Sequence, residues 1–227
     1  SAGFDLFYIE NKERINYDNR KAGGALRFGH PVINDNTCAI VRYKIDRTEL
    51  FANDFTDPEL FPLETAKGIT SSATLTLEYY TRNDRFSPSK GIFADISYER
   101  AGLGGGLKYQ ELSTHLRYFH NLFWDVVWRN NLTYLMVQST DSNDEVPFTE
   151  RYQLGGAYTL RGFGSSTVGK RIFSNFRYKQ SKLPAVDPVT GASNPFSNPG
   201  LTEEERIRYS SVIFGGAKEI LFQTELQ

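Results

Sequence analysis

The amino-acid sequence predicts an all-β protein, and within that class a transmembrane antiparallel β-barrel. Three observations support this. Apolar and polar residues alternate with a period of two in eight segments of the 227-residue chain. These segments run about ten residues, longer than ordinary strands of about five or six, and several polar faces carry both signs of charge. The links between them are short at some positions and long at others. Together these features are typical of a barrel with lipid outside and a wet lumen inside.

Each expected strand is defined by the apolar residues that share one of its faces. In the clearest segment, Leu75, Leu77 and Tyr79 alternate with Thr76 and Glu78, and the apolar face carries no charge. Tyrosine and tryptophan gather at the strand ends, as an interfacial girdle requires. In chain order, the expected strands and their apolar faces are 2–10 (Ala2, Phe4, Leu6, Tyr8), 22–30 (Ala22, Leu26, Phe28), 38–46 (Ala39, Val41, Tyr43, Ile45), 73–80 (Ala73, Leu75, Leu77, Tyr79), 92–99 (Ile92, Ala94, Ile96, Tyr98), 107–119 (Leu112, Thr114, Leu116, Tyr118), 123–136 (Trp124, Val126, Trp128, Leu132, Tyr134, Met136) and 217–227 (Ile220, Phe222, Leu226).

The lengths of the links predict which end of the strands lies outside the cell. Residues 31–36, 83–90 and 120–122 are expected to be tight periplasmic turns, because Pro, Asn and Ser mark them. Residues 11–21, 47–70 and 138–212 are longer, and outer-membrane barrels carry their long loops on the extracellular side. Only the link 101–106 breaks this alternation. A large soluble sandwich or a lipocalin-like barrel stays open as an alternative.

Composition excludes several classes of function. Cys38 is the one cysteine, so neither an intrachain disulfide nor a cysteine-based zinc cluster can form. The formal charge of −1 leaves no footprint for nucleic acid, and no run of apolar residues is long enough for a transmembrane helix. His115 and His120 would face opposite sides of a strand and cannot share a metal ion. The sequence therefore predicts no catalytic residues, no cofactor and no metal site.

A motif within the longest link carries a resemblance to a known family. The residues concerned are Gly155, Gly156, Leu160, Arg161, Gly162, Phe163, Val168 and Gly169. Their pattern resembles the Val-Arg-Gly-Phe loop of the BamA family, the central barrels of the machinery that assembles outer-membrane proteins. Leu160 stands where that family more often has Val. The segments 83–91 and 214–225 are also similar to the family's turn before a strand and to its strand after the loop.

The resemblance implies a fold, a location and a function. The family has a sixteen-stranded barrel, so residues 1–227 are expected to be a partial outer-membrane barrel domain, with 138–212 as a long extracellular loop that folds into the lumen. The implied activity is folding and insertion of β-barrel proteins into the bacterial outer membrane, without enzymatic chemistry or cofactor. The implied partners are nascent outer-membrane β-barrel proteins, accessory lipoproteins of the assembly complex and outer-membrane lipids, with no nucleic acid.

Two other interpretations stay open. Outer-membrane exporters of the two-partner secretion type belong to the same superfamily and carry a similar loop motif. An outer-membrane enzyme or a soluble ligand-binding barrel would need a convergent polar triad or a closed apolar cavity, and the sequence pattern shows neither.

The motif also predicts a specific contact. A guanidinium inside a lumen needs a carboxylate, since an unpaired buried charge is costly. Alternation turns Glu219, Gln223 and Glu225 inward on the strand after the loop, and in the family the loop arginine reaches an acidic side chain on this strand. We therefore expect Arg161 to pair with Glu225 or with a carboxylate on the strand that follows it in the family's barrel. The alternative is an arginine on a surface loop, paired with nothing. Beside it, Gly162 permits a tight turn and Phe163 is expected to pack against other side chains.

Overall fold

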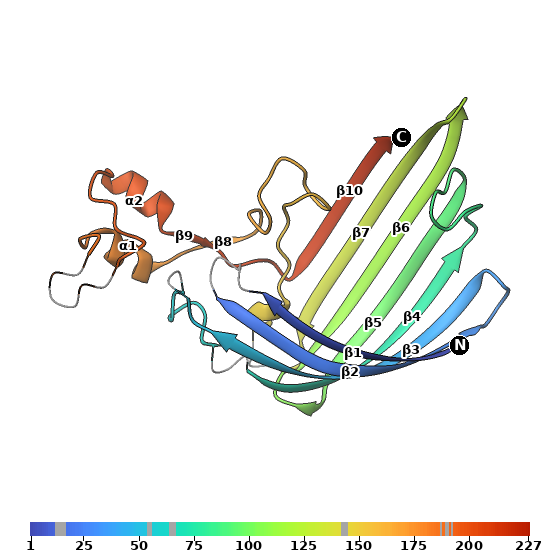
Figure 1. Ribbon diagram of the computed structural model, residues 1–227, viewed down its shortest axis with the longest axis horizontal. Coiled ribbons are helices and arrows are strands. Elements are labelled where there is room, and N and C mark those ends of the chain that lie inside the picture. Colours follow the sequence, from blue (N-terminus) through green and yellow to red (C-terminus); the bar gives the residue numbers. More distant parts are fainter. Residues whose placement is uncertain are drawn as a thin grey trace.

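The main body of the protein is one curved antiparallel sheet. A computed structural model describes residues 1–11, 17–53, 56–63, 67–141, 145–186, 188, 191 and 193–227. Eight strands pair in the order β1-β2-β3-β4-β5-β6-β7-β10 (Figure 1). Their bounds are Ala2–Asn11 (β1), Asp18–Pro31 (β2), Thr37–Phe51 (β3), Gly68–Tyr80 (β4), Gly91–Gly105 (β5), Tyr109–Phe123 (β6), Val126–Ser139 (β7) and Lys218–Leu226 (β10).

The sheet is open. Every pair of sequence neighbours from β1 to β7 is antiparallel, and β10 pairs with β7. Among the described residues, β1 and β10 pair with one strand each, so they form the two edges of a trough, visible in Figure 1. The expectation of a partial barrel is confirmed, since the described strands β1 and β10 do not pair with each other.

Most strands are longer than alternation predicted, and they extend further at one end. β3 continues to Phe51 and β4 begins at Gly68, where a link 47–70 was expected. Loops cover this end of the inner face, so polar residues such as Thr48 and Ser72 are fully buried there. The outward residues at this end are charged, as at Arg47 and Glu49, so the sequence loses its apolar–polar alternation although the strands continue.

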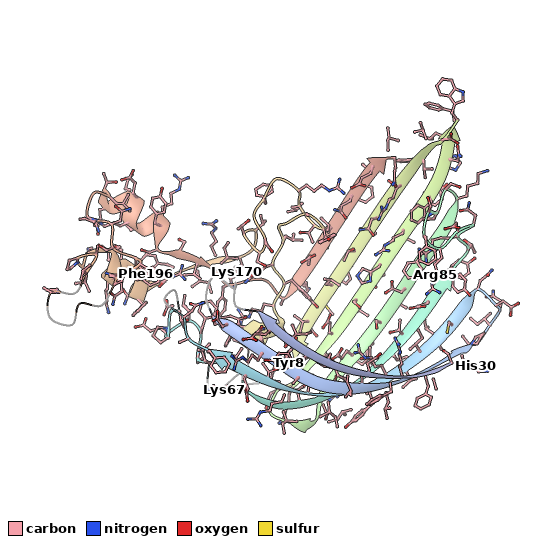
Figure 2. The ribbon with its side chains drawn as sticks, in the orientation of Figure 1. Tyr8, His30, Lys67, Arg85, Lys170 and Phe196 are labelled. Carbon is pink, nitrogen blue, oxygen red and sulfur yellow. The ribbon has the colours of Figure 1, made fainter. Side chains whose placement is uncertain are left out.

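The two ends of the strands differ in their connections. One end carries the links 52–67 and 140–217, and we call it the loop end. The other carries the short links 32–36, 81–90 and 124–125, and we call it the turn end. In Figure 2, Lys67 and Tyr8 lie toward the loop end, while His30 and Arg85 lie toward the turn end.

The longest link is more ordered than its sequence suggested. It contains a 3-10 helix, η2 (Phe148–Glu150), a two-stranded sheet of β8 (Arg171–Phe173) and β9 (Ser211–Ile213), and helices α1 (Asn175–Ser181) and α2 (Glu203–Tyr209). A capping box between Thr202 and Glu205 starts α2, and the acidic residues Glu203, Glu204 and Glu205 form its first turn. Figure 1 shows that β8, β9 and both helices project beyond the sheet, so only the part of the link before β8 folds over the concave face.

The convex face of the sheet is apolar. Its exposed side chains include Leu6 at 76%, Phe222 at 63% and Leu75 at 51% exposure. Neighbouring strands place these residues in continuous rows; one row joins Val41, Leu75 and Tyr98. Such a face requires an apolar surrounding, as the lipid-facing surface of a barrel has. Neither helix of the described chain is long and apolar enough to cross a membrane.

Candidate functional site

The motif loop, residues 152–169, is closed at its base by backbone hydrogen bonds. Tyr152 and Gly216 exchange two bonds of 2.9 Å, so the loop is joined to the residues that lead into β10. Leu154 and Val168 exchange two more, of 2.8 and 2.9 Å, which close the loop on itself. The chain can approach this closely because Gly215 has φ of 77°, and a Cβ there would lie 2.9 Å from the Tyr152 carbonyl oxygen.

The interior of the motif loop depends on two glycines. Leu160 to Phe163 form a β-turn closed by a 3.3 Å bond from the Phe163 N–H to the Leu160 carbonyl. Its third residue, Gly162, has φ of 89°, a conformation that favours glycine. Gly155 also has a positive φ, 119°, and a Cβ there would lie 2.2 Å from the Gly164 carbonyl oxygen. These glycines therefore determine the path of the loop backbone on both sides of Arg161.

Two side-chain contacts attach the motif loop to β10. The Arg161 guanidinium lies 2.9 Å from Glu225 Oε1, and Gln223 Nε2 donates a 2.7 Å hydrogen bond to the Thr159 carbonyl. Both β10 residues share the concave face because their positions differ by two. The Arg161 side chain is 69% exposed and that of Glu225 is 32% exposed, so water screens the pair.

Other residues of the motif make fewer contacts than expected. Gly156 is within the loop, and its N–H donates a 3.0 Å bond to the Phe163 carbonyl. Leu160 is half-buried, whereas the Phe163 side chain, expected to pack against others, is 58% exposed. The motif loop is thus held by its backbone, by Arg161 and by Gln223, and not by the phenylalanine.

The concave face carries paired charges along the strands. Lys44 lies 3.2 Å from Glu99 and 3.7 Å from Asp46, and His115 lies 3.0 Å from Asp95. The two lysine contacts compensate charge, and all three contacts lie on a polar surface such as the wall of a water-filled lumen requires. In the described part of the chain, no group of three or more His, Cys, Asp or Glu residues could hold a metal ion.

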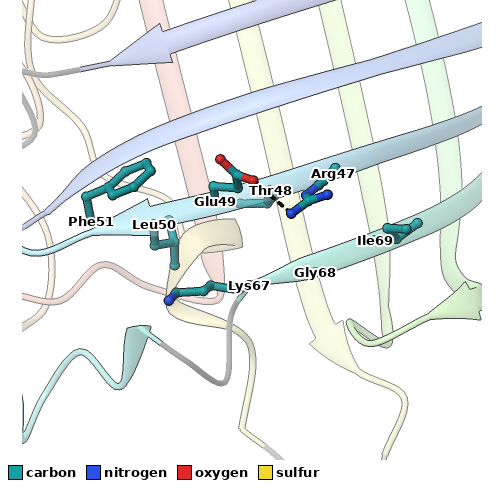
Figure 3. A pocket seen from close by; sticks show the side chains of 8 residues that line it. All are labelled: Arg47, Thr48, Glu49, Leu50, Phe51, Lys67, Gly68 and Ile69. Carbon is teal, nitrogen blue, oxygen red and sulfur yellow. Dashed lines mark ion pairs between the residues drawn. The ribbon is translucent and has the colours of Figure 1, made fainter.

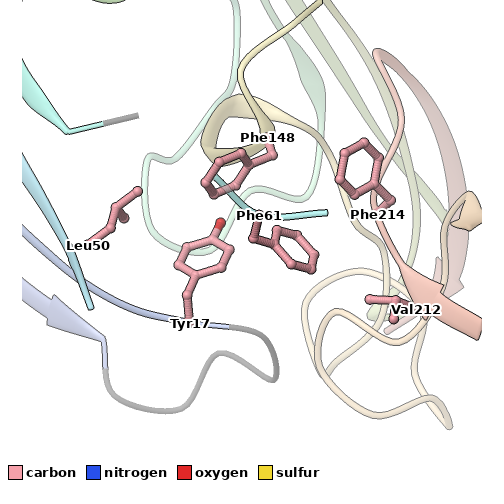
Figure 4. Packing of buried hydrophobic residues seen from close by; sticks show 6 residues of the cluster. All are labelled: Tyr17, Leu50, Phe61, Phe148, Val212 and Phe214. Atoms are coloured by element: carbon pink, nitrogen blue, oxygen red, sulfur yellow. The ribbon is translucent and has the colours of Figure 1, made fainter. Parts of the chain in front are cut away.

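An aromatic cluster, which the sequence did not indicate, joins three links at the loop end. Tyr17 precedes β2, and Phe61 lies in the link between β3 and β4. Phe148 and Phe214 lie within the longest link, near its two ends (Figure 4). The Tyr17 and Phe148 ring centroids are 5.2 Å apart, and those of Phe61 and Phe148 are 5.4 Å apart. These rings form a small hydrophobic core that covers the end of the trough.

Two polar contacts strengthen the same junction. Lys21 of β2 lies 3.1 Å from Glu150 of η2. The fully buried Asp57 accepts a hydrogen bond from Ser174, whose hydroxyl also caps α1 by accepting from the Arg177 N–H at 2.9 Å. Their partners lie 129 and 117 positions apart, so no local pattern could have identified them.

An apolar outer face, a polar inner face and a loop attached inside the trough define a membrane β-barrel protein. A family model described as the Omp85 superfamily domain matches residues 1–219. The chain belongs to the Omp85 superfamily, and it is accordingly an outer-membrane β-barrel protein.

Individual relatives agree with this assignment. The outer membrane protein assembly factor BamA of Nitratidesulfovibrio vulgaris is 24% identical over 166 residues, which cover 72% of this chain and 21% of that protein. The SAM50-like protein CG7639 of Drosophila melanogaster is 26% identical over 106 residues, or 47% of this chain and 24% of that protein. The chain therefore spans less than a quarter of either relative's length.

A solved structure shows the same fold. The crystal structure of BamA from Haemophilus ducreyi lacking POTRA domains 1-3 superposes with a TM-score of 0.70 at 18% sequence identity. The match covers 99% of this chain and 41% of that one. The eight-stranded sheet thus has the shape of one part of a larger barrel.

Proposed function

We propose that this chain is part of a barrel that folds and inserts other β-barrel proteins into the outer membrane. The superfamily match over residues 1–219 carries this proposal, and the chain's similarity to an outer membrane protein assembly factor, BamA, supports it. The proposed partners are nascent outer-membrane β-barrel proteins, accessory lipoproteins and outer-membrane lipids. No covalent bond is made or broken in this activity, so it needs neither catalytic residues nor a cofactor.

The two sheet edges support a larger barrel. An edge strand in lipid leaves backbone N–H and C=O groups without partners, at about several kcal/mol for each group. We therefore infer that β1 and β10 pair with further strands in the membrane. The loop end then faces the cell exterior, and the motif loop lies inside the lumen against β10.

In this barrel the Arg161–Glu225 pair has a positioning role. It joins the motif loop to the barrel wall at a point distinct from the backbone junction at Tyr152 and Gly216. Gly155, Gly156, Leu160, Gly162 and Phe163 shape the loop around this contact. The pair thus limits the positions that the loop can take within the lumen.

Conditional depletion of the complete protein in its source organism tests the function. Assembly predicts a general fall in folded barrel proteins of the outer membrane, measured by their heat-modifiable migration in gels. Restoring the wild-type gene should reverse this fall, and the Arg161→Ala variant should reverse it less completely. Loss of a single secreted protein, with all other barrels at normal levels, would instead indicate an exporter of the two-partner secretion type.

A further inference from the structure

Charged residues on the convex face lie only toward one end of the strands. Along the outward positions of the eight strands, Asp, Glu, Lys and Arg are absent from the middle and from the turn end. At the loop end the outward charged residues are Glu10, Asp18, Arg20, Arg47, Glu49, Arg100 and Lys218. Four of these seven are cations. The face therefore offers cations to lipid headgroups in one leaflet and not in the other.

A groove lies among these charged residues because β3 extends beyond the end of its pairing with β4. The pairing of β3 with β4 ends at Thr48 and Gly68, whereas β3 continues to Phe51 beside β2. Beyond that point β3 and the segment that leads into β4 separate, and they leave a groove of about 420 Å³ (Figure 3). Arg47, Glu49, Phe51, Lys67 and Ile69 are among its lining residues.

The groove has apolar side chains next to cationic ones, an arrangement that suits a ligand with an apolar chain and an anionic head. Toward the middle of the sheet, Ile45 and Ile69 present exposed apolar side chains, at 47% and 55% exposure. Arg47 lies opposite Ile69 in the ladder, two residues beyond Ile45. Lys67 precedes Ile69 by two residues and so lies further toward the loop end, and Phe51 lines the groove beyond Arg47. Each cation thus has an apolar side chain next to it on the membrane side, Ile45 beside Arg47 and Ile69 beside Lys67.

Arg47 is available for an additional anion. It contacts Glu49 through one nitrogen, at 3.0 Å, and its side chain is 67% exposed. A guanidinium has five N–H donors, so further donors are left for a phosphate oxygen. Glu49 competes with an added anion for the Arg47 guanidinium, so replacing Glu49 by a neutral residue should strengthen anion binding.

We propose that this groove binds the phosphate group of an anionic lipid in the outer leaflet, with Arg47 and Lys67 contacting the phosphate and Ile45 and Ile69 contacting an acyl chain. The inference depends on the proposed orientation of the loop end toward the exterior. It does not depend on the assembly activity, and the binding itself can be measured in detergent without either assumption.

The test uses the complete protein, stripped of lipid in detergent, and native mass spectrometry of bound lipid. Phosphatidic acid is the probe, and diacylglycerol with the same acyl chains is the control that lacks the phosphate. Each groove cation should contribute about fivefold to affinity. Arg47→Gln and Lys67→Gln should therefore each weaken phosphatidic acid binding by about that factor. Glu49→Gln should strengthen it, because it removes the competing carboxylate.

Arg100→Gln is the matched control, since Arg100 is an outward cation of β5 outside the groove. It should leave the affinity unchanged. The proposal would be overturned if Arg100→Gln weakened binding as much as the groove variants do. It would also be overturned if diacylglycerol bound as tightly as phosphatidic acid, or if an equal concentration of inorganic phosphate fully displaced the lipid. If the protein supports normal levels of other barrel proteins in the depletion experiment but does not bind phosphatidic acid, the proposed function stands and only the lipid site in this groove is rejected.

Discussion

The contact between Arg161 and Glu225 gives a quantitative prediction about the motif loop. Replacing Arg161 by alanine removes an ion pair of 2.9 Å and a weak 3.4 Å bond from Arg161 Nε to the Ala157 carbonyl. Because Arg161 is 69% exposed, the pair should contribute as an exposed one does, about 0.5–1 kcal/mol. A pair buried away from water would cost about 3–5 kcal/mol when broken.

These two magnitudes predict clearly different populations of the locally open state. A loss of about 0.5–1 kcal/mol raises the open population of the motif loop about two- to fivefold, whereas about 3 kcal/mol raises it more than a hundredfold. Chymotrypsin cleavage at Tyr158 and Phe163 in the complete folded protein measures this population, provided that opening and closing are faster than cleavage.

A double-mutant cycle isolates the pair itself. Arg161→Ala, Glu225→Gln and the double variant should show a coupling energy of about 0.5–1 kcal/mol. Gln223→Ala removes a separate attachment of the loop, so its effect should add to that of Arg161→Ala. Arg85→Ala, at an exposed arginine of the turn end, is the matched control and should change nothing. Strictly additive effects of the Arg161 and Glu225 changes would refute the anchor.

Three further predictions concern the loop backbone, the topology and one turn. Gly155→Ala should open the motif loop more than Arg161→Ala does in the chymotrypsin assay, because the new Cβ would lie 2.2 Å from a carbonyl oxygen; equal cleavage of both proteins would contradict this. After Cys38 is replaced by serine, a cysteine at the exposed Glu204 should react with an impermeant reagent on whole cells, and one at Ser87 should not; the reverse pattern would invert the proposed orientation. Asp84 accepts 2.7 Å hydrogen bonds from the Ser87 and Phe86 N–H groups, which lower the pKa of its carboxyl group. Protection of the Ser87 amide from hydrogen exchange should therefore be complete above the ordinary aspartate pKa and should be lost as the pH falls through the lowered pKa of Asp84. Asp84→Asn should abolish this pH dependence, and an unchanged profile in that variant would refute the prediction.

The sequence by itself determined the strands and their faces. A strand exposes alternate residues to opposite sides, so Leu75 and Leu77, or Gln223 and Glu225, are assigned to their faces by position alone. The same parity directed Glu225 toward the concave side, and the glycines around Arg161 indicated tight turns. Each of these inferences needs only local information, and neighbouring residues along the chain supply all of it.

Only the tertiary structure decided what happens where loops cover the sheet. Thr48 and Ser72 pair within the β3–β4 ladder and are also buried by loops, and burial by a distant segment leaves no periodic trace nearby. Asp57 meets Ser174, and Tyr17 meets Phe148, across more than a hundred positions. Phe163 was expected to pack against other side chains and is 58% exposed, because packing depends on which distant side chains reach it. Alternation specifies a face, but contacts between remote segments depend on the whole fold.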